Sequence, residues 1–154
     1  MSKVYIAYGS NLNVSQMAKR CPKSRLVTTA RLNDYKLVFR GRTGNAHATV
    51  EPAEGSSVPV AIWKVPAEDE RKLDWYEGYP VYYFKENLDV ELPDGKTMSG
   101  MIYLMDLKQR PNVPSSSYID IIATGYDDCG LDINVFLEAL KYNSKEVRAI
   151  KKTP

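Results

Sequence analysis

A single histidine, His47, and two cysteines, Cys21 and Cys129, are the only nitrogen or sulfur zinc ligands among the 154 residues. A structural zinc site takes about four such ligands and a catalytic site about three, so we expect no zinc centre. The cysteines lie far apart and form no C-x-x-C pair. We expect two reduced, structural thiols, although the sequence leaves a single bridge between them open.

The chain also lacks long apolar runs and a strong charge bias. No stretch approaches the roughly 18 apolar residues of a membrane span, and the N-terminus has no apolar leader segment. The net charge is only +2, with both signs interspersed along the sequence. Nothing in this balance favours nucleic acid or an anionic membrane as a partner. We therefore expect a cytoplasmic protein that contacts neither.

The composition is otherwise that of a soluble globular protein, with 44% hydrophobic and 26% charged residues. No repeat or linker divides the sequence, so residues 1–154 are expected to form one domain, long enough to bury a core. Eleven tyrosines stand against three phenylalanines. Tyrosine suits strand surfaces and polar pockets, because the ring packs while the hydroxyl group finds a hydrogen-bond partner.

Strand patterns dominate the first two thirds of the sequence. Apolar and alternating segments predict strands over about 4–8, 26–40, 46–50, 58–65, 82–92 and 97–105. Loops are expected at 41–45 and 52–57, and a hairpin turn at Pro93-Asp94-Gly95-Lys96. Six or seven strands with short helices between them predict an α+β fold. We expect a small, mostly antiparallel sheet, curled or closed into a β-barrel with a few helices packed around it.

Helix signals occur at four places. Asn13 is expected to cap the first helix, and the second covers about 67–76 and stops at Gly78. Ser117 is expected to cap the third helix, and Asp132 to start the fourth. Helical spacing predicts these buried faces: Val14, Met17, Ala18 and Cys21 in the first helix, Ile121, Ile122 and Gly125 in the third, and Phe136, Leu137 and Leu140 in the fourth.

The first strand runs directly into the turn Tyr8-Gly9-Ser10-Asn11-Leu12. Such a turn leaves successive backbone N–H groups without strand partners, next to a helix N-terminus. This arrangement can hold a carboxylate, a phosphate or a developing oxyanion. The same residues are good turn formers, so a plain strand-to-helix connection explains them equally well. The turn is neither a Walker loop nor a dinucleotide fingerprint, because both glycine patterns are missing.

Glu77 occupies a position that disfavours a carboxylate. It follows the second predicted helix, where the exposed carbonyl groups make the potential negative, and it lies within the aromatic segment Trp75-Tyr76-Glu77-Gly78-Tyr79-Pro80. We expect these rings to remove part of its hydration. Both effects raise the pKa of a carboxyl group and make it usable as a general acid or base near neutral pH. An exposed glutamate on the rim of a turn is the simpler interpretation.

Three further residues have side chains suited to a site. Tyr118, at the start of a predicted helix, and Tyr103, within a strand, are candidates for lining a pocket, with core packing the stronger alternative for Tyr103. His47 lies on a short predicted strand, where a buried or edge position explains it. No G-x-S-x-G motif accompanies the histidine, so a serine triad is not indicated.

Several of these segments together resemble one known family, the γ-glutamylcyclotransferases. They are the opening stretch Tyr5-Ile6-Ala7-Tyr8-Gly9-Ser10-Asn11-Leu12, then Leu73-Asp74-Trp75-Tyr76-Glu77-Gly78, then Met101-Ile102-Tyr103-Leu104-Met105, and then Tyr118 with Ile121-Ile122 and Gly125 through Gly130-Leu131. The resemblance runs from about Val4 to Leu140 in the family's order and spacing. Each motif alone is weak, whereas the ordered set is specific.

The resemblance implies a small, mostly antiparallel β-barrel and the release of 5-oxoproline from a γ-glutamyl amide, with no metal or organic cofactor. By position, it implies that the turn from Tyr8 to Leu12 forms a backbone cradle for the γ-glutamyl moiety. It likewise implies that Glu77 is the acid–base residue and that Tyr118 borders the pocket. The segment Ala46-His47-Ala48-Thr49 departs from the more glycine-containing stretch expected there, which leaves the side of the departing amine undefined.

Three functions fit these residues. The first is cyclisation of a γ-glutamyl amino acid or amine, with a small molecule as the substrate. The second is a non-catalytic module that binds a γ-glutamyl compound or another carboxylate metabolite. The third is a specialised biosynthetic enzyme that removes a γ-glutamyl protecting group from one amine. A monomer and a homodimer are both open.

Overall fold

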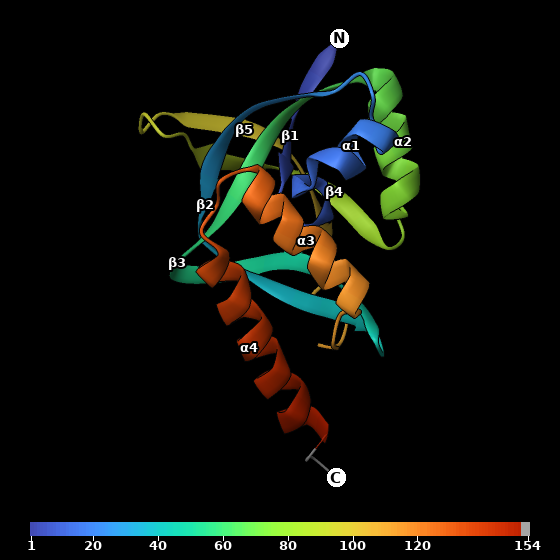
Figure 1. The fold of residues 1–154 in the computed structure, drawn as a ribbon, viewed down its shortest axis with the longest axis vertical. Coiled ribbons are helices and arrows are strands. Elements are labelled where there is room, and N and C mark those ends of the chain that lie inside the picture. Colours follow the sequence, from blue (N-terminus) through green and yellow to red (C-terminus); the bar gives the residue numbers. More distant parts are fainter. Residues whose placement is uncertain (152–154) are drawn as a thin grey trace.

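The computed structural model describes residues 1–151, and its body is a closed β-barrel (Figure 1). The strands follow the order β1-β3-β2-β4-β5 around the barrel. All neighbouring pairs are antiparallel except β1 and β5, which pair in parallel through Tyr5 and Met101 and so close the barrel. The predicted fold class is confirmed. The strands are β1 (Ser2–Ala7), β2 (Arg25–Arg42), β3 (Asn45–Pro66), β4 (Tyr83–Glu91) and β5 (Thr97–Met105).

The number of strands predicted from the sequence was too high, because β2 and β3 form one long hairpin. The predicted loop 41–45 shrinks to a two-residue turn, and the predicted loop 52–57 lies inside β3. Residues 52–57 remain part of β3 because the pairing of β2 with β3 shifts register between Asn33 and Tyr35, opposite this segment. Asp34 there has a positive φ of 65°, and its Oδ1 accepts a hydrogen bond of 3.0 Å from the Gly55 N–H. Gly55 itself has a φ of 84°, which glycine adopts without strain.

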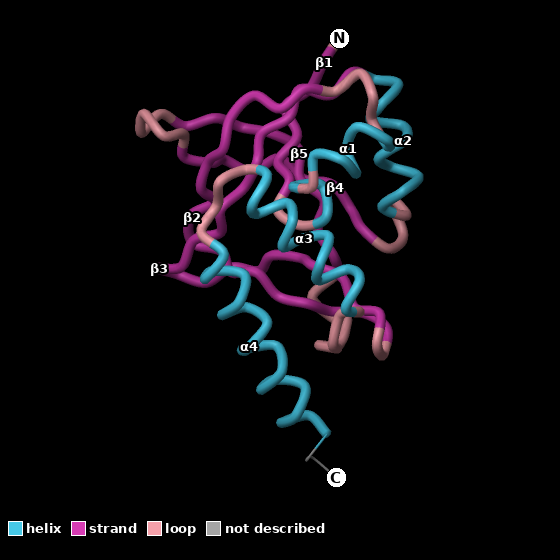
Figure 2. The backbone as a smooth tube through the Cα atoms, viewed as in Figure 1, coloured by secondary structure: helices cyan, strands magenta, loops and turns pink. Residues whose placement is uncertain are grey.

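Helices cover one side and one end of the barrel (Figure 2). Helices α1 and α2 lie near the N-terminus, whereas α4 packs against β2, where its Asn143 Nδ2 donates to the Phe39 carbonyl oxygen at 3.2 Å. The N-terminus and the C-terminal end of α4 lie at opposite ends of the molecule (Figure 1). No helix within residues 1–151 is long and apolar enough to cross a membrane. The elements are the short 3₁₀ turn η1 (Ser10–Leu12), α1 (Val14–Arg20), α2 (Ala67–Glu77), α3 (Ser116–Asp128) and α4 (Ile133–Lys151).

Helix boundaries agree with the sequence at α1 and α2 and differ at α3. Asn13 caps α1 through its side-chain oxygen, which accepts from the Gln16 N–H, and Gly78 ends α2 in the left-handed conformation. The cap of α3 is Ser115 rather than Ser117: its hydroxyl oxygen accepts from the Tyr118 N–H at 3.2 Å. The helix therefore begins two residues earlier than predicted.

The predicted buried faces hold only in part. Val14 and Ala18 of α1, and Leu137 of α4, are exposed. Helix α1 is short and packs against η1 and α2, and of its predicted face only Met17 and the following Cys21 reach the core. Cys21 and Cys129 are both free thiols, as expected.

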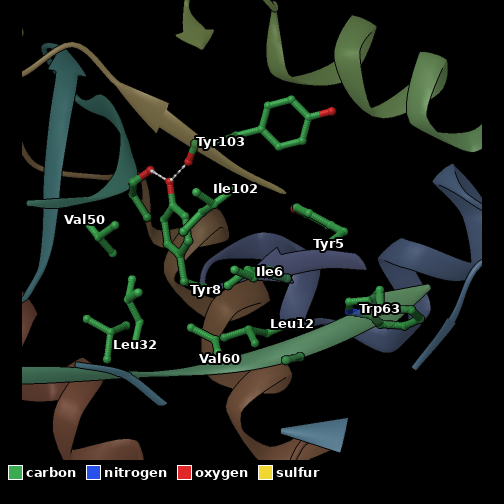
Figure 3. Packing of buried hydrophobic residues seen from close by; sticks show 14 of the residues in the cluster. Tyr5, Ile6, Tyr8, Leu12, Leu32, Val50, Val60, Trp63, Ile102 and Tyr103 are labelled. Atoms are coloured by element: carbon green, nitrogen blue, oxygen red, sulfur yellow. Dashed lines mark hydrogen bonds between the residues drawn. The ribbon is translucent and has the colours of Figure 1, made fainter. Parts of the chain in front are cut away.

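The barrel interior is filled by side chains from all five strands, and aromatic residues reach its rim (Figure 3). Ile6 and Ile102 are fully buried, and Leu12 joins them from η1. Tyr8 stands at the boundary between this apolar core and a polar pocket. Its hydroxyl group donates to the carbonyl oxygen of Tyr103 at 2.6 Å, which anchors the end of β1 to β5.

Candidate active site

A pocket opens where the end of β1 meets the C-terminal end of α2 and the start of α3. All the residues predicted for the site line it, except Leu12. The fold thus brings the N-terminal turn together with Glu77 and Tyr118, which lie far along the chain. The lining residues are Tyr5, Tyr8, Gly9, Ser10, Asn11, Ala48, Glu77, Tyr83, Tyr103 and Tyr118.

The turn after β1 supplies backbone donors, but fewer than its sequence predicts. The Leu12 N–H donates to the Gly9 carbonyl oxygen at 3.0 Å, and the Asn13 N–H donates to the Ser10 carbonyl oxygen at 3.1 Å. The side chain of Leu12 is fully buried in the core. Leu12 therefore offers neither its side chain nor a free N–H group to this pocket. The N–H groups of Ser10 and Asn11, which open the 3₁₀ turn, have no earlier carbonyl within it to bond.

Two glycines fix how closely other elements approach this turn. A Cβ atom on Gly9 would lie 3.4 Å from the Cβ of Ala48 and 3.5 Å from the Tyr118 hydroxyl, and so would occupy the pocket itself. A Cβ atom on Gly125 of α3 would lie only 2.7 Å from the backbone of Leu12 and Asn13. Helix α3 can press directly on the turn because residue 125 has no side chain.

Glu77 is the last residue of α2 and lies partly buried at the pocket wall. Burial raises its pKa from 4.5 to about 7, and the positive charge of Arg20 opposes that rise. The raised pKa and burial as its leading cause both match the expectation. Trp75 is 85% exposed, and Tyr76 and Tyr79 also face solvent. Tyr76 still lines the recess beside Glu77, and the other rings around the pocket come from elements distant in sequence.

Three of the pocket tyrosines use their hydroxyl protons within the protein. Tyr8 donates to the Tyr103 carbonyl oxygen, and Tyr83 donates to the Ala48 carbonyl oxygen at 2.6 Å. The Tyr103 hydroxyl donates to Asp74 Oδ1, also at 2.6 Å. These bonds tie β5 to the end of β1 and to α2, and they tie β4 to β3, so these tyrosines hold the walls of the pocket.

Tyr5 and Tyr118 behave differently, because both hydroxyl oxygens accept. The Asn11 Nδ2 donates to the Tyr5 oxygen at 2.9 Å, and the Ala48 N–H donates to the Tyr118 oxygen at 3.0 Å. Each hydroxyl group therefore keeps its own proton for another acceptor. Burial raises the pKa of both phenols, and the Glu77 carboxylate raises it further. They stay protonated and remain donors throughout the neutral pH range.

A second recess of about 260 Å³ adjoins the pocket and shares Glu77, Ser10 and Tyr118 with it. His47 and Tyr82 form its far wall, with the His47 Nδ1 and the Tyr82 hydroxyl 2.7 Å apart. The edge of the His47 ring also meets the Tyr118 ring. The recess is far larger than the roughly 10–15 Å³ that one water molecule requires. It extends the site to the side that the sequence left undefined.

Tyr5, Ala48 and Tyr83 were not predicted as site residues, and Tyr103 was assigned more readily to the core. Only one signal in the sequence pointed to them, namely the excess of tyrosine over phenylalanine. The structure explains part of that excess, because tyrosines line the pocket that contains the Glu77 carboxyl group. Across the described part of the chain, no group of three or more His, Cys, Asp or Glu side chains could hold a metal ion.

Comparisons with known proteins agree with this fold. The γ-glutamylcyclotransferase of Homo sapiens is 32% identical over 149 residues, covering 91% of this chain and 78% of that protein. The γ-glutamylcyclotransferase of Bos taurus is 30% identical over 141 residues, covering 86% and 74%. A solved structure of a γ-glutamyl cyclotransferase superposes with a TM-score of 0.82 at 31% identity, covering 92% of this chain and 87% of the other.

The barrel with a pocket at the first turn is thus that of the γ-glutamylcyclotransferase class of enzymes. A family model described as γ-glutamyl cyclotransferase, AIG2-like, matches residues 5–120. The chain belongs to this family. The predicted family, fold and enzyme class are confirmed.

Proposed function

We propose that this chain cyclises a γ-glutamyl amide, releasing 5-oxoproline and a free amine, with Glu77 as the general acid and base. The observation that carries the proposal is a partly buried carboxyl group with a pKa of about 7, set against a cradle of neutral donors. The relatives named γ-glutamylcyclotransferase support the same reaction. A small γ-glutamyl compound is the substrate.

The cradle suits the two oxygen-rich ends of a γ-glutamyl group. The N–H groups of Ser10 and Asn11 and the hydroxyl protons of Tyr5 and Tyr118 are donors at the pocket wall. One set of donors binds the α-carboxylate, and the other meets the γ-carbonyl oxygen as it gains charge. Bending the chain in this way brings the α-nitrogen to the γ-carbon. Reacting groups that are tethered and oriented reach effective molarities of roughly 10⁵–10⁸ M, so no covalent nucleophile is needed.

Glu77 then moves the protons. Its carboxylate accepts a proton from the α-ammonium group, and the freed amine attacks the γ-carbon, forming the ring C–N bond. The bond to the other nitrogen breaks as the Glu77 carboxyl group returns a proton to it. Of the three protons on the α-ammonium group, one stays on the lactam nitrogen and two leave with the departing amine as its ammonium. A carboxyl group with a pKa near the working pH serves both steps, and such catalysis contributes about 10²–10⁴-fold.

Hydrogen-bond donors that are already in place stabilise the negative charge that develops on the γ-carbonyl oxygen of the substrate. Tyr118 is held by the Ala48 N–H, and its free proton points to the same pocket as Glu77. Loss of one such donor typically costs on the order of 10²–10³ in rate. The departing amine lies in the recess walled by His47 and Tyr82.

A panel of γ-glutamyl amides tests the proposal, with 5-oxoproline and free amine measured as products. The panel includes γ-glutamyl amino acids of increasing size and amides of bulky amines. Equal amounts of 5-oxoproline and amine are expected from at least one member. The variant Glu77→Gln is expected to bind that substrate and lose nearly all turnover.

Binding without product from any member would instead identify a non-catalytic binding module. Turnover confined to one bulky amine would identify a specialised deprotecting enzyme with the same chemistry. An active Glu77→Gln enzyme would remove Glu77 from the proton transfers while leaving the reaction itself intact.

A further inference from the structure

Arg20, at the end of α1, joins two parts of the site that lie far apart in the sequence. Its Nη1 donates to the Asn11 Oδ1 in the turn, and its Nη2 donates to the Gln16 Oε1 at 2.6 Å. The guanidinium group also lies over the ring of Tyr76, 3.4 Å from its centre. Tyr76 directly precedes Glu77, so one cation contacts both the turn and the end of α2.

The contact with Arg20 decides which way the Asn11 amide points. An amide has one acceptor oxygen and one NH₂ group. Because Arg20 occupies the oxygen, the Nδ2 faces the opposite way and donates to the Tyr5 hydroxyl at 2.9 Å and to Glu77 Oε1 at 3.3 Å. A reversed amide would bring its oxygen against the carboxylate, where no proton lies between the two acceptors.

We propose that Arg20 is a positioning residue for Glu77: it fixes the Asn11 amide so that this amide donates to the Glu77 carboxyl group and holds it at the pocket wall. The catalytic part of this inference rests on the proposed function, whereas the geometric part does not. Arg20 is not among the residues that line the pocket. It therefore acts through Asn11 and not on the substrate.

The pKa of Glu77 is sensitive to the charge of Arg20, because the other groups that face Glu77 are neutral near pH 7. The titratable groups that face it from the packed elements are Tyr5, Tyr8, Tyr82, Tyr83, Tyr103 and Tyr118, and the pKa of each phenol is raised, chiefly by burial. These phenols are neutral near pH 7. His47, across the recess, has its pKa lowered by burial and by Arg42, so it also tends to be neutral there. Arg20 is the cation that acts on the Glu77 pKa against burial.

The test measures the ionisation of Glu77 and the reaction separately. The carboxyl ¹³C signal of Glu77, assigned by its absence in Glu77→Gln, is followed against pH in the wild type and in Arg20→Gln, Arg20→Lys and Lys19→Gln. Lys19 is an exposed cation one residue away on the same helix and is the matched control. Steady-state kinetics with the best substrate of the panel give kcat and KM for each protein.

Arg20→Gln is expected to raise the Glu77 midpoint by about one pH unit, since a nearby opposite charge typically lowers a carboxyl pKa by about 1–3. Arg20→Lys keeps the charge but cannot hold Asn11 and Gln16 in a planar fork, so its midpoint stays within about half a unit. Both variants are expected to lose about ten- to a hundredfold in kcat with little change in KM, because a misplacement of about 1 Å costs on the order of 10². Lys19→Gln is expected to match the wild type.

An unchanged midpoint in Arg20→Gln, or an equal change in Lys19→Gln, would overturn the proposal. If Arg20→Gln does not fold, Gln16→Ala takes its place, because it frees one arm of the guanidinium group and is expected to shift the midpoint in the same direction by less. A wild type without turnover would refute the proposed function, whereas the ¹³C titration would still decide the role of Arg20.

Discussion

Replacing Glu77 with glutamine is expected to stabilise the protein by an amount that grows as the pH rises above about 4.5 and levels off above about 7. Folding buries this carboxyl group and raises its pKa from 4.5 to about 7. At about 1.4 kcal/mol for each pH unit, the difference corresponds to about 3 kcal/mol. Glutamine has nearly the same shape and can accept the Asn11 hydrogen bond at the same oxygen, so the variant differs chiefly in having no charge to bury.

The sign follows from the two protonation states. A group whose pKa is higher in the folded protein contributes stability below its unfolded pKa, and that contribution is lost as the pH rises through the folded pKa. The wild type therefore loses up to about 3 kcal/mol between roughly pH 4.5 and 8 that Glu77→Gln does not lose. The variant is expected to exceed the wild type by less than about 1 kcal/mol at pH 5 and by about 3 kcal/mol at pH 8.5.

Urea unfolding at these two pH values measures the free energy of unfolding of both proteins. At about 2–4 °C for each kcal/mol, the melting temperature at pH 8.5 is expected to rise by about 6–12 °C. Glu138→Gln, on the exposed surface of α4, is the control and is expected to show no such dependence on pH. The same gain at pH 5 and pH 8.5, or none at either, would refute the argument that burial raises the Glu77 pKa.

Three further outcomes are expected. The value of kcat/KM is expected to fall on acidification with a midpoint near pH 7, because protonated Glu77 cannot accept the proton of the α-ammonium group; a flat profile from pH 5 to 9 would contradict this. Tyr118→Phe is expected to lower kcat by about 10², and Tyr83→Phe by less, because only Tyr118 has a hydroxyl proton free for the substrate; equal losses would contradict that assignment. Gly125→Ala is expected to cost about 1–3 kcal/mol in thermal unfolding, because its Cβ would lie 2.7 Å from the backbone of Leu12 and Asn13, and unchanged stability would show that α3 can move away from the turn.

The sequence alone determined the local features of this protein. The strand patterns, the hairpin turn after β4, the Asn13 cap and the Gly78 stop are encoded within a few residues, because backbone conformation and hydrogen-bonding groups close by decide them. The ordered motifs also identified the family. Where the prediction failed, as inside β3, the pairing of two long strands outweighed a loop-forming composition.

Only the tertiary structure decided what the site residues do. Burial raises the Glu77 pKa, and the pocket that Glu77 shares brings together tyrosines from β1, β4, β5 and α3, which are distant in sequence. Whether a tyrosine holds a wall or offers a proton depends on the donor or acceptor that it meets, as Tyr83 shows at the carbonyl oxygen of Ala48 and Tyr118 at its N–H. Burial and hydrogen bonding are set by partners up to a hundred residues away, so no local pattern records them. Arg20, an ordinary helix-end cation in the sequence, acquires its place beside Asn11 and Tyr76 only when the barrel closes.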